Sequence, residues 1–254
     1  MSSIPIGRVI EKLDEYLNLN SDYEGAERHL KYWLAEAEYQ RDDRGAFAVV
    51  NEMIGLYRKC GRRRDAYKAC DRVMELTKKL GIEEETGGAT AFLNVGTVYK
   101  AFGDPAGALP KYEHARKIYE KNLEASDPRL GGLYNNMALT LTDLERYDEA
   151  ESMFHQALRV MEQKEHGETD CAITYLNLAE LEERRYGFDQ AEDKILAYMD
   201  QAWAKLNAPD LPRDGYYAFA AEKCIPLFIH YEYYLIANEL ERRIREIRGG
   251  DRRA

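Results

Sequence analysis

An alanine recurs along this chain at a nearly constant interval, and this recurrence constrains the fold more than any other feature. Ala26, Ala66, Ala108, Ala150 and Ala191 are separated by 40, 42, 42 and 41 residues. Each of them lies in the second of two segments whose apolar residues follow helical spacing. Such a period predicts an array of helix pairs in which every pair packs on its neighbours and the core grows by stacking.

The clearest copy of the repeat lies between residues 131 and 158. Its first segment carries an aromatic, a large apolar and a small residue at Tyr134, Met137 and Ala138, and its second places Ala150 four residues before Phe154. This pattern resembles that of tetratricopeptide repeat proteins. The long interval is similar to that of kinesin light chains and of some bacterial cytosolic regulators. The resemblance implies an all-α fold, a right-handed superhelical solenoid of α–α pairs.

The repeats predict one solenoid over residues 1–254. Their predicted ranges are 7–39, 43–80, 87–123, 128–163 and 169–206, followed by a C-terminal capping helix pair at 215–248. The Pro-rich segment 207–214 separates the last pair from the repeats. Pro226 lies inside the first helix of that pair, so we expect a kink or a break near Cys224.

Composition excludes several classes of protein. The formal net charge of −10 argues against general nucleic-acid binding, because such binding depends on Lys and Arg side chains that neutralise phosphates. No run approaches the roughly 20 apolar residues of a membrane span, and the opening residues lack the apolar core of a signal peptide. A cytoplasmic protein without membrane contact is therefore expected.

The sequence offers no reactive constellation, so we expect no enzyme, no cofactor and no metal site. Nucleophile-elbow, phosphate-loop, dinucleotide-binding and zinc-protease motifs are all missing from it. The five histidines are scattered over different repeats. The cysteines form no CxxC pair, and we expect reduced, mostly buried thiols at Cys60, Cys70, Cys171 and Cys224.

One face of each first helix is expected to stay open, because the packed positions cluster on the opposite side at 100° per residue. On that open face, the same position is asparagine in three consecutive repeats, Asn94, Asn136 and Asn177. A carboxamide carries both a donor and an acceptor, so it can bind the backbone of an extended peptide whatever its side chains are. In the family that the chain resembles, asparagines at this position line the peptide groove.

Other residues join the candidate groove. They are Asn135, Lys59, Lys100, Thr97 and Arg184. The second repeat departs from the asparagine row, because Glu52 takes the equivalent place. The basic residues lie toward the second repeat and acidic residues toward the fifth, which could give a bound segment one direction.

The sequence thus predicts a non-enzymatic adaptor or scaffold that binds an extended peptide segment of another protein in a concave groove. Three alternatives stay open at this point. The asparagines could only link neighbouring helices, or the array could be a regulator that responds to a signalling peptide. The chain could also be a self-associating structural subunit, a homodimer formed through aromatic residues of the last helix pair. These residues are Tyr216, Tyr217, Phe219, Tyr231, Tyr233 and Tyr234.

Overall fold

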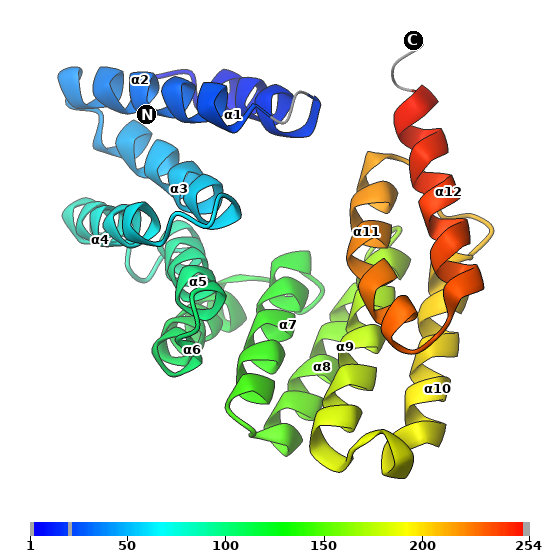
Figure 1. The fold of residues 1–254 in the computed structure, drawn as a ribbon. Coiled ribbons are helices and arrows are strands. Elements are labelled where there is room, and N and C mark those ends of the chain that lie inside the picture. Colours follow the sequence, from blue (N-terminus) through cyan, green and yellow to red (C-terminus); the bar gives the residue numbers. More distant parts are fainter. Residues whose placement is uncertain (1–2, 20–21, 251–254) are drawn as a thin grey trace. The chain divides into compact units, whose positions relative to one another are not determined.

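The computed structural model of the chain describes residues 3–19 and 22–250. These residues form helices and no strand, so the prediction of an all-α fold is confirmed. The chain divides into two compact units, Met1–Leu123 and Glu124–Ala254, which we call the N-terminal unit and the C-terminal unit. In both, consecutive helices run side by side as pairs (Figure 1).

The helices fall within or close to the ranges expected from the repeats. The N-terminal unit contains α1 (Ile6–Asp14), a short π-helical segment η1 (Glu15–Leu19), α2 (Tyr23–Tyr39), α3 (Asp43–Lys59), α4 (Arg63–Leu80), α5 (Thr86–Ala101) and α6 (Pro105–Asn122). The C-terminal unit contains α7 (Pro128–Asp143), α8 (Tyr147–Met161), α9 (Glu168–Tyr186), α10 (Phe188–Leu206), α11 (Gly215–His230) and α12 (Tyr234–Gly250). The prediction of a single solenoid over all these pairs stays a prediction.

Aspartates that precede the helices explain where several of them begin. In the N-terminal unit, the side chains of Asp22, Asp42 and Asp104 each accept a hydrogen bond of 2.8 Å from the backbone N–H three residues later. Each bond satisfies one of the N–H groups that a helix start leaves without an intrahelical partner. Proline follows Asp104 and Asp127, and its fixed φ suits the first helical position.

Small residues allow the helices of a pair to approach closely. All five recurring alanines are buried, four of them with no exposed surface and Ala191 with 3 %. Bulky neighbours fill the remaining space, such as Tyr112 in the N-terminal unit and Phe154 in the C-terminal unit, neither of which is exposed. The alanine period therefore marks the buried contacts of the helix pairs.

The helix does not break at Pro226, because α11 continues without interruption from Gly215 to His230, and the expected kink near Cys224 stays a prediction. A proline in a helix removes one backbone N–H, so the carbonyl four residues earlier, that of Glu222, loses its intrahelical donor. Glu222 and Pro226 are both exposed. Water can therefore hydrate that carbonyl, and the helix tolerates the missing hydrogen bond. The structure likewise keeps α6 continuous through Pro110.

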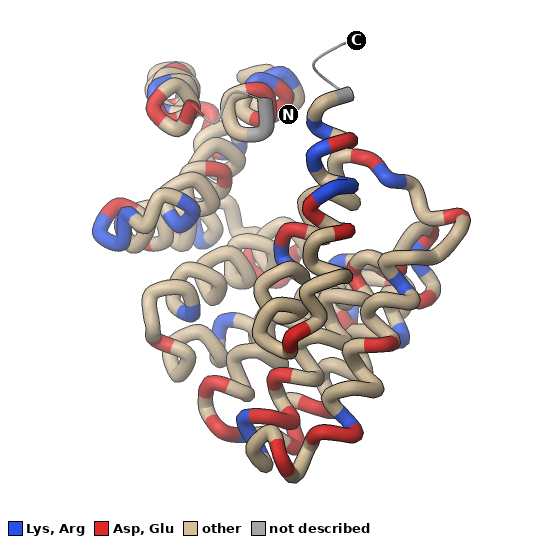
Figure 2. The backbone as a smooth tube through the Cα atoms, turned by 45° about the vertical axis from the view of Figure 1, so that its right-hand side comes forward, with Lys and Arg blue, Asp and Glu red and all other residues tan. Residues whose placement is uncertain are grey.

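Acidic and basic residues are interspersed among uncharged ones along the helices of both units (Figure 2). Many of them form ion pairs, some within one helix and others between neighbouring helices, as between Lys79 and Asp43 at 2.8 Å. Among the described residues, no helix combines the length and the apolar character that crossing a bilayer requires.

Candidate functional site

The positions expected to face the open side of the first helices are all at least partly exposed. We call these positions the open face. They are Ala48, Glu52, Gly55 and Lys59 on α3, Thr90, Asn94, Thr97 and Ala101 on α5, Gly132, Asn136, Leu139 and Asp143 on α7, and Ile173, Asn177, Glu180 and Arg184 on α9. None of these sixteen described residues is buried. The opposite side of the same helices is packed, as at Tyr134 and Met137 of α7.

The open face of the N-terminal unit contains a pocket of about 270 Å³ between α3 and α5. Asn94 lines this pocket, and its Nδ2 donates to Oδ1 of Asn51 at 3.1 Å. Asn51 is fixed in turn, since its Nδ2 donates to the backbone oxygen of Phe47 at 3.2 Å. Within the described chain, Oδ1 of Asn94 has no hydrogen-bond partner. The Asn94 amide is thus oriented by a neighbour and still offers an acceptor.

Thr97 lines the same pocket, but its hydroxyl is already engaged. It donates to the backbone oxygen of Leu93 at 2.9 Å and accepts from the Tyr112 hydroxyl at 3.3 Å. Of the two predicted lysines, Lys59 is exposed at the end of α3, and Lys100 is half-buried on α5. Neither lysine lines the pocket.

In the C-terminal unit, an ion pair links the open faces of α7 and α9. Nη1 of Arg184 lies 2.9 Å from Oδ1 of Asp143, and this hydrogen bond raises the pKa of the guanidinium. Asn136 and Asn177 each lie seven residues before one member of the pair, which is two turns of helix, so they face the same side. Both are half-buried, and no side-chain hydrogen bond joins either amide to another described residue.

Asn135 has a different surrounding from Asn136 beside it. Its Nδ2 donates to Oγ1 of Thr174 on α9 at 2.8 Å and lies 4.0 Å from Sδ of Met161. Its Oδ1 is buried and has no partner among the described residues. This amide therefore packs between α7 and α9, and we leave it out of the open face.

Sequence reasoning missed two polar contacts, one inside the pocket and one outside the open face. Asn51 was overlooked because it precedes the expected position by one residue, although it fixes Asn94. His230 of α11 was overlooked as well, and its Nε2 lies 2.8 Å from Oε2 of Glu183 on α9.

The thiols have the environment of structural residues. Cys70, Cys171 and Cys224 are buried and Cys60 is exposed, and none of the four forms a disulfide, as expected from the sequence. Burial raises the pKa of each buried thiol to about 12, which keeps it protonated and unreactive. In the part of the chain that the structure describes, no three His, Cys, Asp or Glu side chains form a group able to hold a metal ion.

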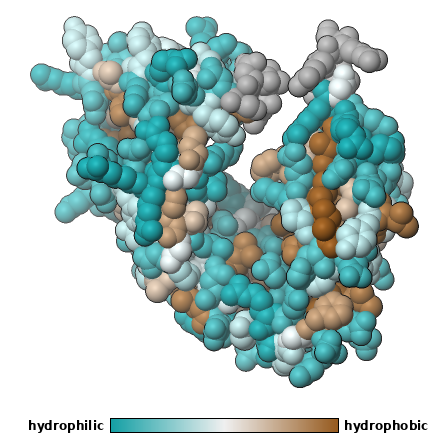
Figure 3. Space-filling model, in the orientation of Figure 1, coloured by the Kyte–Doolittle hydropathy of each residue, from teal (hydrophilic) through white to brown (hydrophobic). Residues whose placement is uncertain are grey.

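Five of the six aromatic residues named for the last helix pair divide into two groups, and the half-buried Tyr233 lies between them. Tyr217 and Tyr231 are buried at 1 % and 7 % exposure, whereas Tyr216, Phe219 and Tyr234 are about half exposed. Residues of high hydropathy form a stripe over the α11–α12 pair in the space-filling view (Figure 3). Packing thus explains the first group, and a homodimer contact through the second stays a prediction.

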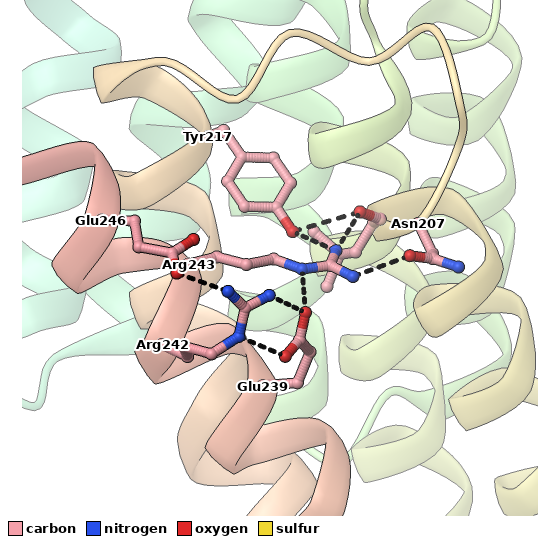
Figure 4. Close-up of polar contacts among 7 residues, drawn as sticks. Asn207, Tyr217, Glu239, Arg242, Arg243 and Glu246 are labelled. Carbon is pink, nitrogen blue, oxygen red and sulfur yellow. Dashed lines mark hydrogen bonds and ion pairs between the residues drawn. The ribbon is translucent and has the colours of Figure 1, made fainter. Parts of the chain in front are cut away.

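Buried Tyr217 belongs to a polar cluster around Arg243 (Figure 4). The Arg243 guanidinium donates to the Tyr217 hydroxyl at 3.0 Å, to Oδ1 of Asn207 at 2.8 Å and to Oε1 of Glu239 at 2.8 Å. It also lies 5.0 Å from the ring centre of Trp203. The cluster joins the end of α10 to α11 and α12, so it holds the last helix pair against the preceding one.

Comparisons with known proteins agree with this architecture. A tetratricopeptide repeat model matches residues 46–121 and 130–194. BtubC (BKLC) from P. vanneervenii superimposes with a TM-score of 0.68 at 20 % identity, over 82 % of this chain and 85 % of that one. RapI in its apo form gives a TM-score of 0.58 at 15 % identity, over 100 % of this chain and 87 % of that one.

A putative kinesin light chain from Podosopora anserina, with nearly identical TPR-like repeats, gives a TM-score of 0.55 at 15 % identity, over 81 % of this chain and 96 % of that one. At such identities the likeness establishes the helical solenoid fold. No curated protein matches the chain. The repeat model covers more than half of the 254 residues, and the chain therefore belongs to the tetratricopeptide repeat family.

Proposed function

We propose that this protein is a non-enzymatic interaction module whose open faces bind an extended peptide segment of a partner protein. Tetratricopeptide repeats are generally protein–protein interaction modules and scaffolds without catalytic activity. The protein would need no cofactor, and its partner would be a protein or peptide rather than a nucleic acid or a membrane. The reduced, buried thiols are in keeping with a cytoplasmic location.

The observation that carries the proposal is the state of Asn136 and Asn177. Both amides lie on the open faces of neighbouring helices, and neither is used by another side chain of the described residues. Equivalent positions on the two helices are close in space, because Asp143 and Arg184 form an ion pair two turns further on. Two such amides in equivalent positions can each accept from and donate to a peptide backbone.

Asn94 supports the same function in the N-terminal unit, where its Oδ1 is available within the pocket. The alternative, in which the asparagines only link helices, describes Asn135, whose amide bonds to Thr174 of α9, and the Nδ2 group of Asn94, which bonds to Asn51 of α3. It does not describe Asn136 and Asn177.

A random peptide library selected on the whole protein tests the proposal. We expect it to yield extended binders whose affinity falls when Asn94, Asn136 and Asn177 are all replaced by alanine. Each lost hydrogen bond should weaken binding by about 1 kcal/mol, or roughly fivefold. Titration calorimetry with the selected peptides would measure the loss.

Asn238→Ala provides the matched control, because Asn238 is an exposed asparagine of α12 outside the open face. It should leave peptide affinity unchanged, and urea unfolding should show that the triple variant is folded. Selection of no binder, or equal affinity of the triple variant and the parent protein, would contradict the proposed function.

A further inference from the structure

The pocket between α3 and α5 differs from the asparagine positions, because it brings charged groups together. Glu52, Gly55 and Arg58 of α3 line it together with Asn94 and Thr97 of α5. Its volume of about 270 Å³ lies just below the roughly 300–1,000 Å³ of pockets that enclose small molecules. The space therefore suits one side chain of a peptide and the backbone next to it.

Glu52 is the residue in this pocket whose partly buried negative charge is not balanced by an ion pair. Its side chain is half-buried, and it has no hydrogen bond or ion pair with another described residue. Burial and the carboxylate of Asp14 on α1 raise its pKa, and the charge of Lys59 opposes this effect without cancelling it. A partly desolvated carboxylate beside a second carboxylate gains free energy when a cation approaches.

The other lining groups decide what kind of cation can enter. Oδ1 of Asn94 is an acceptor without a partner among the described residues, so it can receive a peptide N–H. At Gly55, an added Cβ would meet nothing within 4 Å, which leaves room for a chain to lie against α3. The pocket thus offers two acceptors, the Glu52 carboxylate and Oδ1 of Asn94, beside the uncovered backbone of α3 at Gly55. This arrangement favours a ligand that donates hydrogen bonds from both its backbone and its side chain.

Arg58 limits the length of the cationic part. It lies six residues after Glu52, or about 9 Å along the helix axis. Its guanidinium has no ion pair with another described residue, so it would repel a second basic side chain at that end of the pocket. One basic residue at the Glu52 end therefore fits, and a run of basic residues does not.

We propose that this pocket selects peptide segments carrying a single lysine or arginine, whose side chain donates to the Glu52 carboxylate while Asn94 accepts from the adjoining backbone N–H. The proposal rests on the proposed peptide-binding function and names the chemistry of its ligand. The net charge of −10 acts in the same direction, because it attracts basic segments at long range. Glu52, which interrupts the asparagine row, thereby becomes the residue that confers specificity.

The test uses a random peptide library and the whole protein. The parent protein should enrich peptides with one Lys or Arg at a fixed position. Glu52→Gln should lower the affinity for these peptides about tenfold, because a hydrogen bond to a charged group is lost. Glu52→Lys should enrich acidic residues at that position instead, and Glu113→Gln, an exposed residue of α6, should change nothing.

Two further measurements separate specificity from folding. Gly55→Leu should fill the pocket and abolish binding of the basic peptides, since Gly55 lines the pocket and a Cβ added there meets nothing within 4 Å. Carboxyl NMR should show that the pKa of Glu52 falls when a selected basic peptide binds, and that it does not fall with the Lys→Gln version of that peptide.

The outcomes distinguish this inference from the function on which it rests. Peptides without a basic preference, or equal binding by Glu52→Gln, would overturn the Glu52 assignment while Asn94→Ala still weakens binding. If neither Asn94→Ala nor the substitutions at Asn136 and Asn177 weaken any selected peptide, both the inference and the peptide-binding function fail.

Discussion

At the scale of single residues, Arg243 is the side chain on which the last helix pair depends most. Its side chain is 7 % exposed and supplies donors to Tyr217, Asn207 and the backbone oxygen of Leu206. Arg243→Ala leaves the buried Tyr217 hydroxyl without its donor, whereas the Leu206 oxygen keeps its hydrogen bond from Tyr217 and the exposed Asn207 can turn to water. We expect it to lower the free energy of unfolding by about 1–3 kcal/mol, the range for leaving a buried polar group without its hydrogen-bond partner.

Urea unfolding followed by the fluorescence of Trp203, which contacts the guanidinium, measures the loss. Arg245→Ala is the control on the same helix, since its side chain is 69 % exposed and pairs with Glu241 within α12. It should change stability by less than about 0.5 kcal/mol. Similar effects of the two substitutions would show that the Arg243 cluster does not stabilise the protein.

The sequence predicted which helix face the residues of the candidate site occupy, but not which hydrogen bonds their side chains form. Helical periodicity places Asn94, Asn136 and Asn177 on the open side, and the structure leaves all three at least partly exposed. Periodicity does not say which amide a neighbouring helix will use. Asn135 bonds to Thr174, and Asn136 beside it does not, because a difference of 100° turns one side chain toward α9 and the next toward solvent.

At the scale of helices, two glycines in the N-terminal unit should respond oppositely to the same substitution. A Cβ on Gly96 of α5 would lie 2.8 Å from Cε1 of Tyr112 on α6, whose ring is fully buried and whose hydroxyl is bonded to Thr97. Gly96→Ala should therefore push the pair apart and destabilise it by about 1–3 kcal/mol, more than the gain in helix propensity of about 1 kcal/mol.

Gly55→Ala on α3 is the matched comparison, because its Cβ would meet nothing within 4 Å. It gains the helix propensity without a clash and should stabilise the unit by about 0.5–1 kcal/mol. Urea unfolding followed by Trp33 fluorescence measures both. If both substitutions changed the free energy of unfolding in the same direction, the close approach of α5 and α6 would not be the reason for a glycine at position 96.

The boundaries of helices were predictable where the chain carries a strong local signal. Asp followed by Pro is such a signal for a helix start, and Asp104 and Asp127 cap α6 and α7. Pro226 alone did not decide between a kink and a break, because the cost of a proline depends on whether water reaches the carbonyl that loses its donor. Exposure depends on the tertiary structure, so it cannot be predicted from the residues that neighbour Pro226 in the sequence.

At the scale of the whole molecule, the recurring alanines predicted a packed core but not its division into two units. Each unit has its own core, with Trp33 packed against one and Trp203 against the other. The interval from Ala108 to Ala150, which spans the boundary at residue 123, equals that from Ala66 to Ala108 within the N-terminal unit. Spacing alone therefore carries no signal for the division.

Because each core contacts one tryptophan, the pH dependence of stability can be measured for each core by fluorescence. In the N-terminal unit, we expect Glu27 to determine how stability depends on pH. Hydrogen bonds from Arg62, and then from Lys31, lower the pKa of Glu27 from 4.5 to about 2. Since the folded-state pKa is the lower one, the ionised carboxylate stabilises the fold above about 4.5, and this contribution is lost as the pH falls toward 2.

Glu27→Gln should remove this contribution, which linkage limits to at most about 3 kcal/mol. In a Trp203→Phe background, the urea midpoint reported by Trp33 should fall less steeply between about pH 6 and about pH 3 than in the parent protein. Glu24→Gln on the same helix should leave the slope unchanged, because the Glu24 side chain is 91 % exposed and lies 3.8 Å from Arg28. Equal slopes in all three proteins would show that the bonds between Glu27 and Arg62 do not carry the acid sensitivity of this unit.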